Sequence, residues 1–215
     1  MAFSMLNRIF YPKTDSSEYH ILVNAVNKIK LLEGFTCEIG CYKGGSSLLI
    51  LKTLLKNEDK KIHIGIDPYG NIDYKHWEDK IDKGTRNYTD HVKNKMLSDI
   101  YKWCSKSNME FKFFNLEDIE FFKRYKDGVP VYDRKYENNK KIINYYSLVF
   151  FDGPHSTKII KNQINFFHKK IVKQGFMVFD DIHQYNHKKE LHNYILSLGY
   201  EIYEEGIIKI SYSKC

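Results

Sequence analysis

The hydrophobic pattern of the chain alternates between short apolar runs and longer amphipathic segments. The apolar runs, which are typical of buried strands, span residues 35–40, 61–67, 109–115, 146–153 and 175–181. The segments with apolar residues at helical intervals span residues 15–29, 46–56, 88–107, 157–172 and 186–199. Strands that alternate with helices predict a mainly parallel sheet with helices packed on both faces.

Two further apolar runs close the chain without a helix between them. Residues 200–205 and 207–213 are joined at Glu205 and Gly206, which predicts an antiparallel hairpin at the end of the sheet. The pattern therefore predicts an α/β fold with seven strands. A length of 215 residues, with 42% apolar and 15% aromatic residues, fits one globular domain over 1–215. We expect a helical segment over 1–32 and the α/β core over 33–213.

Charge and hydropathy narrow the environment and the partners of the chain. No apolar run approaches the roughly 20 residues that a membrane helix needs, and the N-terminus lacks a signal-peptide pattern. We therefore expect a cytoplasmic protein with no membrane partner. The net charge of +7 favours anionic partners, but Lys is spread among acidic residues, which disfavours nucleic acid without excluding it. The pattern leaves a homo-oligomer open.

A glycine-rich loop follows the first predicted strand. Residues 37–47 read CEIGCYKGGSS, so the strand ends at Gly40 and a helix begins after Gly44 and Gly45. Such a loop lets the backbone approach a ligand, or serves as a tight turn with no ligand. The dinucleotide fingerprint needs glycine where Tyr42 stands, and no GK[ST] sequence is present. NAD, FAD and a Walker-type phosphate loop are therefore disfavoured.

Four motifs together resemble one family. The glycine loop at 38–46, GIDPYG at 65–70, FFDGPH at 150–155 and GFMVFDDIH at 175–183 look like those of the class I S-adenosylmethionine-dependent methyltransferases. Within these, the chain is most similar to small-molecule O-methyltransferases of the macrocin and cephalosporin-hydroxylase type. The resemblance covers nearly the whole predicted core. It implies a Rossmann-like fold, S-adenosylmethionine as cofactor and a small-molecule acceptor.

The resemblance also implies which residues bind the cofactor. The glycine loop would approach its methionine part, with Glu38 orienting the loop or accepting from the ammonium group. Asp67, at the end of the second strand, would accept the ribose hydroxyls, although a turn cap is an alternative. The adenine would lie near Asn115 and Leu116, although LED at 116–118 could equally be the first turn of a helix. The predicted cofactor-binding residues are Glu38, Gly40, Tyr42, Gly44, Gly45, Ser46, Asp67, Asn115, Leu116 and Asp152.

Three aspartates follow two strands that are predicted to be neighbours. Asp152 ends one strand, and Asp180 and Asp181 end the next, so their carboxylates should converge at one edge of the sheet. Grouped carboxylates repel one another unless a cation neutralises them, and oxygen ligands suit Mg²⁺, with Mn²⁺ or Ca²⁺ as alternatives. The resemblance implies the same three metal ligands. In the structural alternative, Asp180 caps a helix and Asp152 orders the cofactor loop.

Methyl transfer to a hydroxyl requires an acceptor that is positioned and deprotonated. A metal held by Asp152 could do both, and His155 or His183, which follow predicted ligands, could take the proton. Asp152, His155 and His183 are therefore the candidate catalytic residues. The sequence departs from the macrocin-type pattern at Pro154, where those enzymes tend to carry an acidic base. The identity of the base stays open.

Two segments, 71–88 and 124–141, are longer than the alternation requires. The first follows the carboxyl end of a strand and is a candidate lid over the acceptor, whereas the second is a candidate surface or oligomer contact. Solvated insertion is the alternative for both. The leading hypothesis is a metal-dependent O-methyltransferase acting on a sugar, polyketide or similar metabolite. An RNA methyltransferase, favoured by charge alone, and a non-catalytic cofactor-binding relative are the alternatives.

Overall fold

The structure is a computed structural model that describes residues 16–70, 88–132 and 140–215. Within these residues, seven strands form one sheet in the order β3-β2-β1-β6-β7-β9-β8. Their bounds are β1 Phe35–Ile39, β2 His63–Ile66, β3 Phe111–Phe114, β6 Tyr146–Phe151, β7 Ile171–Phe179, β8 Tyr200–Glu205 and β9 Ile210–Lys214. The first five of these run parallel, and β9 runs antiparallel to β7 and β8. The predicted fold class and the C-terminal hairpin are confirmed.

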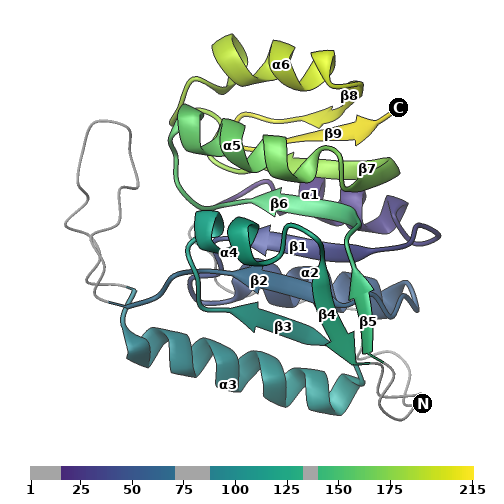
Figure 1. The fold of residues 1–215 in the computed structure, drawn as a ribbon, viewed down its shortest axis with the longest axis vertical. Helices are drawn as coiled ribbons and strands as arrows, with labels where there is room; N and C mark the ends of the chain where they lie inside the picture. Colours follow the sequence, from purple (N-terminus) through teal and green to yellow (C-terminus); the bar gives the residue numbers. More distant parts are fainter. Residues whose placement is uncertain (1–15, 71–87, 133–139) are drawn as a thin grey trace.

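Helices cover both faces of this sheet (Figure 1). The helices are α1 Tyr19–Lys28, α2 Gly45–Lys56, α3 Asp90–Ser107, α4 Asp118–Arg124, α5 Thr157–Phe167 and α6 His192–Ser197, the last preceded by a π-helical turn, His187–Leu191. Helices α1, α2 and α3 share one core cluster with the sheet, and α4, α5 and α6 share the other. A separate antiparallel pair, β4 Val129–Tyr132 and β5 Lys140–Ile143, packs on the α4 side.

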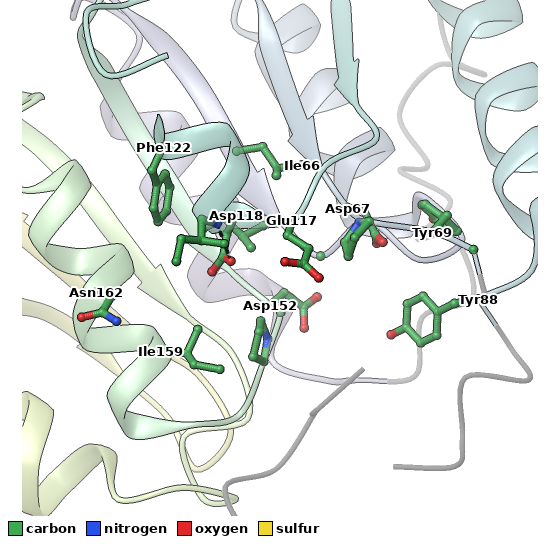
Figure 2. A pocket seen from close by; sticks show the side chains of 17 residues that line it. Ile66, Asp67, Tyr69, Tyr88, Glu117, Asp118, Phe122, Asp152, Ile159 and Asn162 are labelled. Atoms are coloured by element: carbon green, nitrogen blue, oxygen red, sulfur yellow. Dashed lines mark hydrogen bonds between the residues drawn. The ribbon is translucent and has the colours of Figure 1, made fainter. Parts of the chain in front are cut away.

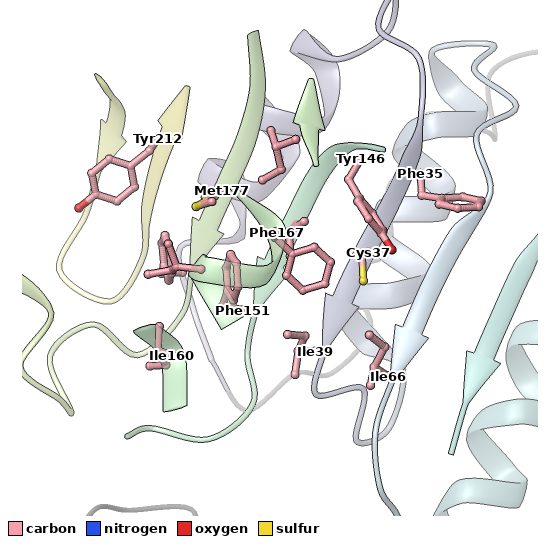
Figure 3. Packing of buried hydrophobic residues seen from close by; sticks show 14 of the residues in the cluster. Phe35, Cys37, Ile39, Ile66, Tyr146, Phe151, Ile160, Phe167, Met177 and Tyr212 are labelled. Atoms are coloured by element: carbon pink, nitrogen blue, oxygen red, sulfur yellow. The ribbon is translucent and has the colours of Figure 1, made fainter. Parts of the chain in front are cut away.

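The two halves of the core follow the two-residue period of the strands. In β7, Met177 and Phe179 lie in the cluster with α5, whereas Phe176 and Val178 lie in the cluster with α1 and α2. Figure 3 shows Phe167 of α5 among side chains of β1, β6 and β7. Because both faces of these strands are buried, their sequences are continuously apolar rather than alternating. The carboxyl ends of β1, β2, β6 and β7 could therefore be predicted from the sequence.

The strand order reverses between β1 and β6, and the carboxyl ends of these two strands are held together there. The N–H of Asp152 donates to the carbonyl of Ile39 at 2.9 Å. Gly40 follows with φ of 89°, and a Cβ at this position would lie 2.0 Å from the carbonyl oxygen of Asp152. Glycine is therefore required at 40 by the contact between the two strand ends. In open α/β sheets, ligands bind in the crevice beyond such a switch point.

The structure differs from the prediction at the end of α5, the start of β7, helix α4 and the β4–β5 pair. Helix α5 ends at Phe167 rather than at 172, because Ile171 instead begins β7 and pairs with Tyr146. An apolar run can be helix or strand, and here the pairing with β6 decides. For helix α4 only a first turn at 116–118 was considered, and the β4–β5 pair was not predicted. They are short, and Pro130 lies within β4, where proline is tolerated in an edge strand.

Candidate cofactor-binding and catalytic site

A cavity of about 360 Å³ lies beyond the carboxyl ends of β1, β2 and β6 (Figure 2). Its lining comes from these strand ends, the segment after β2, the start of α4 and the first turns of α5. Three residues of the sequence prediction, Gly40, Asp67 and Asp152, line it. They come from three different strands, and they meet because the carboxyl ends of parallel strands share one edge of a sheet.

Asp67 connects the end of β2 to the glycine loop. Its Oδ2 accepts the backbone N–H groups of Cys41 at 2.8 Å and Tyr42 at 3.0 Å. The backbone N–H of Tyr69 also donates to this carboxylate. An ionised carboxylate offers about four acceptor positions, so roughly one remains for a ribose hydroxyl, where the sequence interpretation expected two. The side chain therefore shapes the loop and faces the cavity at once.

Burial dominates the protonation of Asp67. It raises the pKa of this carboxyl from its ordinary value of 3.8 to about 6, and the nearby charge of Glu38 acts in the same direction. The hydrogen bonds from Tyr42 and Cys41 oppose the rise. At neutral pH the side chain is thus ionised, and the fold carries a desolvated negative charge at the edge of the cavity.

Glu38 lies behind the cavity rather than in its lining. The side chain is fully buried, and its Oε2 accepts the hydroxyl hydrogen of Ser47 at the start of α2. The same oxygen lies 3.6 Å from Nε2 of His63 on β2, whose Nδ1 is 3.1 Å from the hydroxyl of Thr36. The structure thus places Glu38 where it can orient the loop and α2, which was one of its two predicted roles.

The remaining residues of the glycine loop lie at the start of α2. Gly44 is the N-cap residue, with φ of 76°, and Gly45 and Ser46 open the first turn. The ring of Tyr42 packs against Tyr88, with ring centroids 5.1 Å apart. None of these four predicted residues is among the described residues that line the cavity. Their position beside Gly40 indicates that they shape the loop that borders the cavity.

The residues predicted for adenine lie just before the cavity lining. Asn115 is exposed and Leu116 packs against the core, whereas Glu117, Asp118 and Ile119 line the cavity where the chain enters α4. The sequence contained the signal, since LED was also interpreted as the first turn of a helix. Because the chain turns into α4 there, the residues that line the cavity lie two positions after the predicted pair. The side chain of Phe122, one turn further along α4, adds apolar surface beside these acidic residues.

Asp152 is a carboxyl in the cavity wall. One side of it is accessible from the cavity, and protein atoms surround the rest. Burial, followed by the charge of Asp180, raises the pKa of Asp152 well above its ordinary value of 3.8, while the ammonium group of Lys209 opposes this shift. A carboxyl with a raised pKa, next to space for a substrate, is suited to take up a proton.

The three aspartates predicted as metal ligands do not form a metal-holding group. Across residues 16–70, 88–132 and 140–215, no set of three or more His, Cys, Asp or Glu side chains could hold a metal ion. Oδ1 of Asp180 lies 2.6 Å from the ammonium group of Lys209, and Oδ2 of Asp181 lies 3.3 Å from Nε2 of His155. The arrangement of these residues therefore does not fit Mg²⁺, and no step below depends on a metal.

The two histidines predicted as bases lie outside the cavity lining. His155 is buried beside Asp181, and its ring is nearly parallel to that of Tyr185, with centroids 6.1 Å apart. His183 is exposed on the segment after β7. Of the three candidate catalytic residues, Asp152 is the one that lines the described cavity. Lys209, which the sequence interpretation did not consider, contacts Asp180 from the hairpin turn.

The match to a known family spans the elements that build this site. The sequence profile of the Methyltransferase domain family matches residues 37–182, from β1 through the end of β7. The chain belongs to this family. Its mainly parallel sheet with a C-terminal hairpin is the Rossmann-like methyltransferase fold that the four motifs indicated.

A viral relative and solved methyltransferases resemble the chain. Uncharacterized protein R132 of Acanthamoeba polyphaga mimivirus is 26% identical over 175 residues, which cover 81% of this chain and 63% of R132. The chain thus spans less than two thirds of that relative. The O-methyltransferase NovP gives a TM-score of 0.59 at 11% identity, covering 90% of this chain and 77% of NovP. The O-methyltransferase TomG of Streptomyces achromogenes, involved in tomaymycin synthesis and solved with S-adenosylmethionine, gives 0.53 at 11% identity, covering 94% and 81%. These likenesses show a shared fold.

The two predicted insertions lie partly outside the described residues. The candidate lid, 71–88, lies outside them except for Tyr88, whose ring lines the cavity. The second insertion contributes β4 and part of β5, with 133–139 outside the described residues. Among the helices that the structure describes, none combines the length and the apolar character needed to cross a bilayer.

Proposed function

We propose that this methyltransferase transfers the methyl group of S-adenosylmethionine to an oxygen of a small hydroxylated acceptor, such as a sugar or a polyketide. The observation that carries the proposal is the position of Asp152, whose carboxyl has a raised pKa and faces the same cavity as Asp67. One carboxyl group can bind the cofactor while the other takes a proton from the acceptor. The lining of the cavity therefore supports O-methylation, which needs a bound cofactor and a proton acceptor.

Several residues of the cavity suit the cofactor. Asp67 can accept a ribose hydroxyl, while Ile66, Pro68 and Phe122 offer apolar surface for the adenine ring. When bound, S-adenosylmethionine supplies an electrophilic methyl group on a positively charged sulfur. The carboxylates of Asp67 and Glu117 line the same space and favour a cation over an anion there.

The reaction is an in-line displacement in which Asp152 manages the proton. The acceptor oxygen forms a bond to the methyl carbon as the bond from that carbon to sulfur breaks. The hydroxyl proton passes to the carboxylate of Asp152, whose raised pKa favours its uptake. The divalent cation that the sequence suggested has no place in this scheme, because its expected ligands are paired with Lys209 and His155.

The charge of the lining argues for a neutral acceptor. Asp67, Glu117, Asp118 and Asp152 line the cavity, and among its described lining residues there is no Lys, Arg or His. Four acidic groups repel phosphate, which weighs against RNA at this site even though the net charge of the chain is +7. A neutral alcohol or phenol meets no such repulsion.

Calorimetry and product analysis test the proposal separately. Binding of S-adenosylmethionine to the full chain, and its loss in Asp67→Ala, would establish the cofactor site. Incubation with methyl-labelled cofactor and a panel of hydroxylated sugars and phenols should then yield a labelled methyl ether. Label found only in RNA, with binding that weakens steeply with salt, would favour the nucleic-acid alternative. Cofactor binding with no labelled product from either class would favour a non-catalytic relative.

A further inference from the structure

Lys209 lies where the sequence led us to expect a metal ion. It precedes β9 in the turn of the C-terminal hairpin, and its ammonium group is 2.6 Å from Oδ1 of Asp180. The side chains of Lys209 and Asp180 are both 0% exposed. The ammonium group is also 2.6 Å from the hydroxyl of Ser16 and 4.1 Å from the ring centroid of Tyr19. A buried ammonium group is costly unless it is paired and hydrogen-bonded, and here it is both.

The backbone around Lys209 is held in place by the segment before α1. The carboxylate of Glu18 accepts the backbone N–H groups of Ile207, Ile208 and Lys209 at 3.1, 2.8 and 3.0 Å. Ser16, two residues earlier, donates its hydroxyl to Oδ1 of Asp180 at 2.9 Å. Two distant parts of the chain therefore fix the lysine against the end of β7. This preorganisation distinguishes Lys209 from a flexible surface lysine.

Each of the three expected metal ligands interacts with a lysine or histidine side chain. Asp180 is paired with Lys209, and Asp181 is paired with His155. The positive charge of Lys209 also acts on Asp152, where it opposes the repulsion from Asp180. The fixed ammonium group thus reduces the repulsion between Asp180 and Asp152, as a bound metal cation would. Oδ1 of Asp180 is thus already occupied by a fully buried ammonium group.

We propose that Lys209 is the built-in cation of this site and takes the place of a divalent metal. The chain then binds S-adenosylmethionine and positions its acceptor without Mg²⁺ or Mn²⁺. Lys209 acts through Asp180 and Asp152 and is a positioning residue, because it is not among the residues that line the described cavity. The inference concerns the same cavity as the proposed O-methylation, but it holds for any acceptor.

Mn²⁺ binding to the 215-residue chain tests the inference without an acceptor. Free Mn²⁺ is measured by electron paramagnetic resonance, and the thermal midpoint is measured in chelator and in Mn²⁺. The variants are Lys209→Met, Asp180→Asn and the double variant, with Lys214→Met as control. Lys214 lies at the end of β9, the strand that Lys209 precedes, but its ammonium group donates to the carbonyls of His168 and Ile171, away from the aspartates.

We expect wild type and Lys214→Met to bind no Mn²⁺ and to show no shift of the midpoint. Lys209→Met should be less stable in chelator, and its midpoint should rise by about 3 to 6 °C once Mn²⁺ exceeds its dissociation constant tenfold. Adding Asp180→Asn should abolish that response and recover part of the lost stability, because the unpaired carboxylate is gone. If Lys209→Met alone does not fold but the double variant does, the recovery shows that Lys209 is needed to neutralise Asp180.

Two results would overturn the inference. One is Mn²⁺ binding by wild type that disappears in Asp180→Asn, since the metal would then be the native cation. The other is a Lys209→Met variant that gains no metal response and is not rescued by Asp180→Asn, since the lysine would then be structural. Neither measurement uses an acceptor, so a failure of the O-methylation proposal would leave both results interpretable.

Discussion

Replacing Asp67 with Asn separates the stability of the fold from the binding of the cofactor. The carboxyl is 2% exposed, and its pKa is about 6 in the folded chain against an ordinary value of 3.8. A carboxyl whose folded pKa is raised stabilises the fold while it is protonated, and this contribution is lost as the pH rises through 6. At pH 7.5 the ionised side chain therefore lowers the free energy of unfolding of wild type, and Asp67→Asn removes this unfavourable charge.

The size of the effect follows from the pKa difference. At about 1.36 kcal/mol per pKa unit, the charge of Asp67 costs about 3 kcal/mol at pH 7.5 and about 1.6 kcal/mol at pH 5. The amide oxygen of the variant can still accept from Cys41 and Tyr42, but its NH₂ group cannot accept a hydrogen bond at the position of the second carboxylate oxygen. That mismatch costs about 1 to 2 kcal/mol at any pH. The stability of Asp67→Asn relative to wild type should thus rise by about 1.4 kcal/mol between pH 5 and pH 7.5.

Urea denaturation of both proteins at the two pH values measures this change, provided that the m-values agree. Titration calorimetry with S-adenosylmethionine supplies the second readout. Because the variant loses a charged acceptor for the ribose, we expect affinity to fall roughly 10- to 100-fold. A relative stability that does not change with pH would refute the argument from burial. Equal affinity for the cofactor would refute the assignment of the ribose site.

Three further substitutions probe separate parts of the structure. Asp152→Asn should slow single-turnover methyl transfer by roughly 10²- to 10⁴-fold with near-normal cofactor affinity, and an unchanged rate would remove it as the base. Gly40→Ala places a Cβ 2.0 Å from the carbonyl of Asp152 at a positive φ, so urea denaturation should show a loss of more than about 2 kcal/mol; wild-type stability would contradict the described contact. Ser156→Ala removes the N-cap hydrogen bond to Ile159 of α5 and should cost about 1 kcal/mol, whereas cofactor affinity should not change.

Much of the fold could be predicted because it depends on local periodicity. Apolar runs buried on both faces, separated by amphipathic helices, indicated the parallel sheet, and the run joined at Glu205 and Gly206 indicated the hairpin. The boundaries of α5 and β7 were less certain, because Ile171 fits a helix or a strand equally well until its pairing with Tyr146 is known. Local sequence thus indicated the main elements, and strand pairing determined where two of them meet.

The site divides in the same way. Gly40, Asp67 and Asp152 each directly follow a parallel strand. Because parallel strands bring their carboxyl ends to one edge of the sheet, the positions of these residues in the sequence were enough to predict that they meet there. The partners of Asp180 are different. Lys209 is 29 residues away and Ser16 is 164 residues away, and neither belongs to a motif that contains the aspartate. Which cation faces a buried carboxylate depends on how the hairpin turn and the segment before α1 pack against β7. No local pattern encodes that packing, so the tertiary structure alone placed an ammonium group where the sequence suggested a metal.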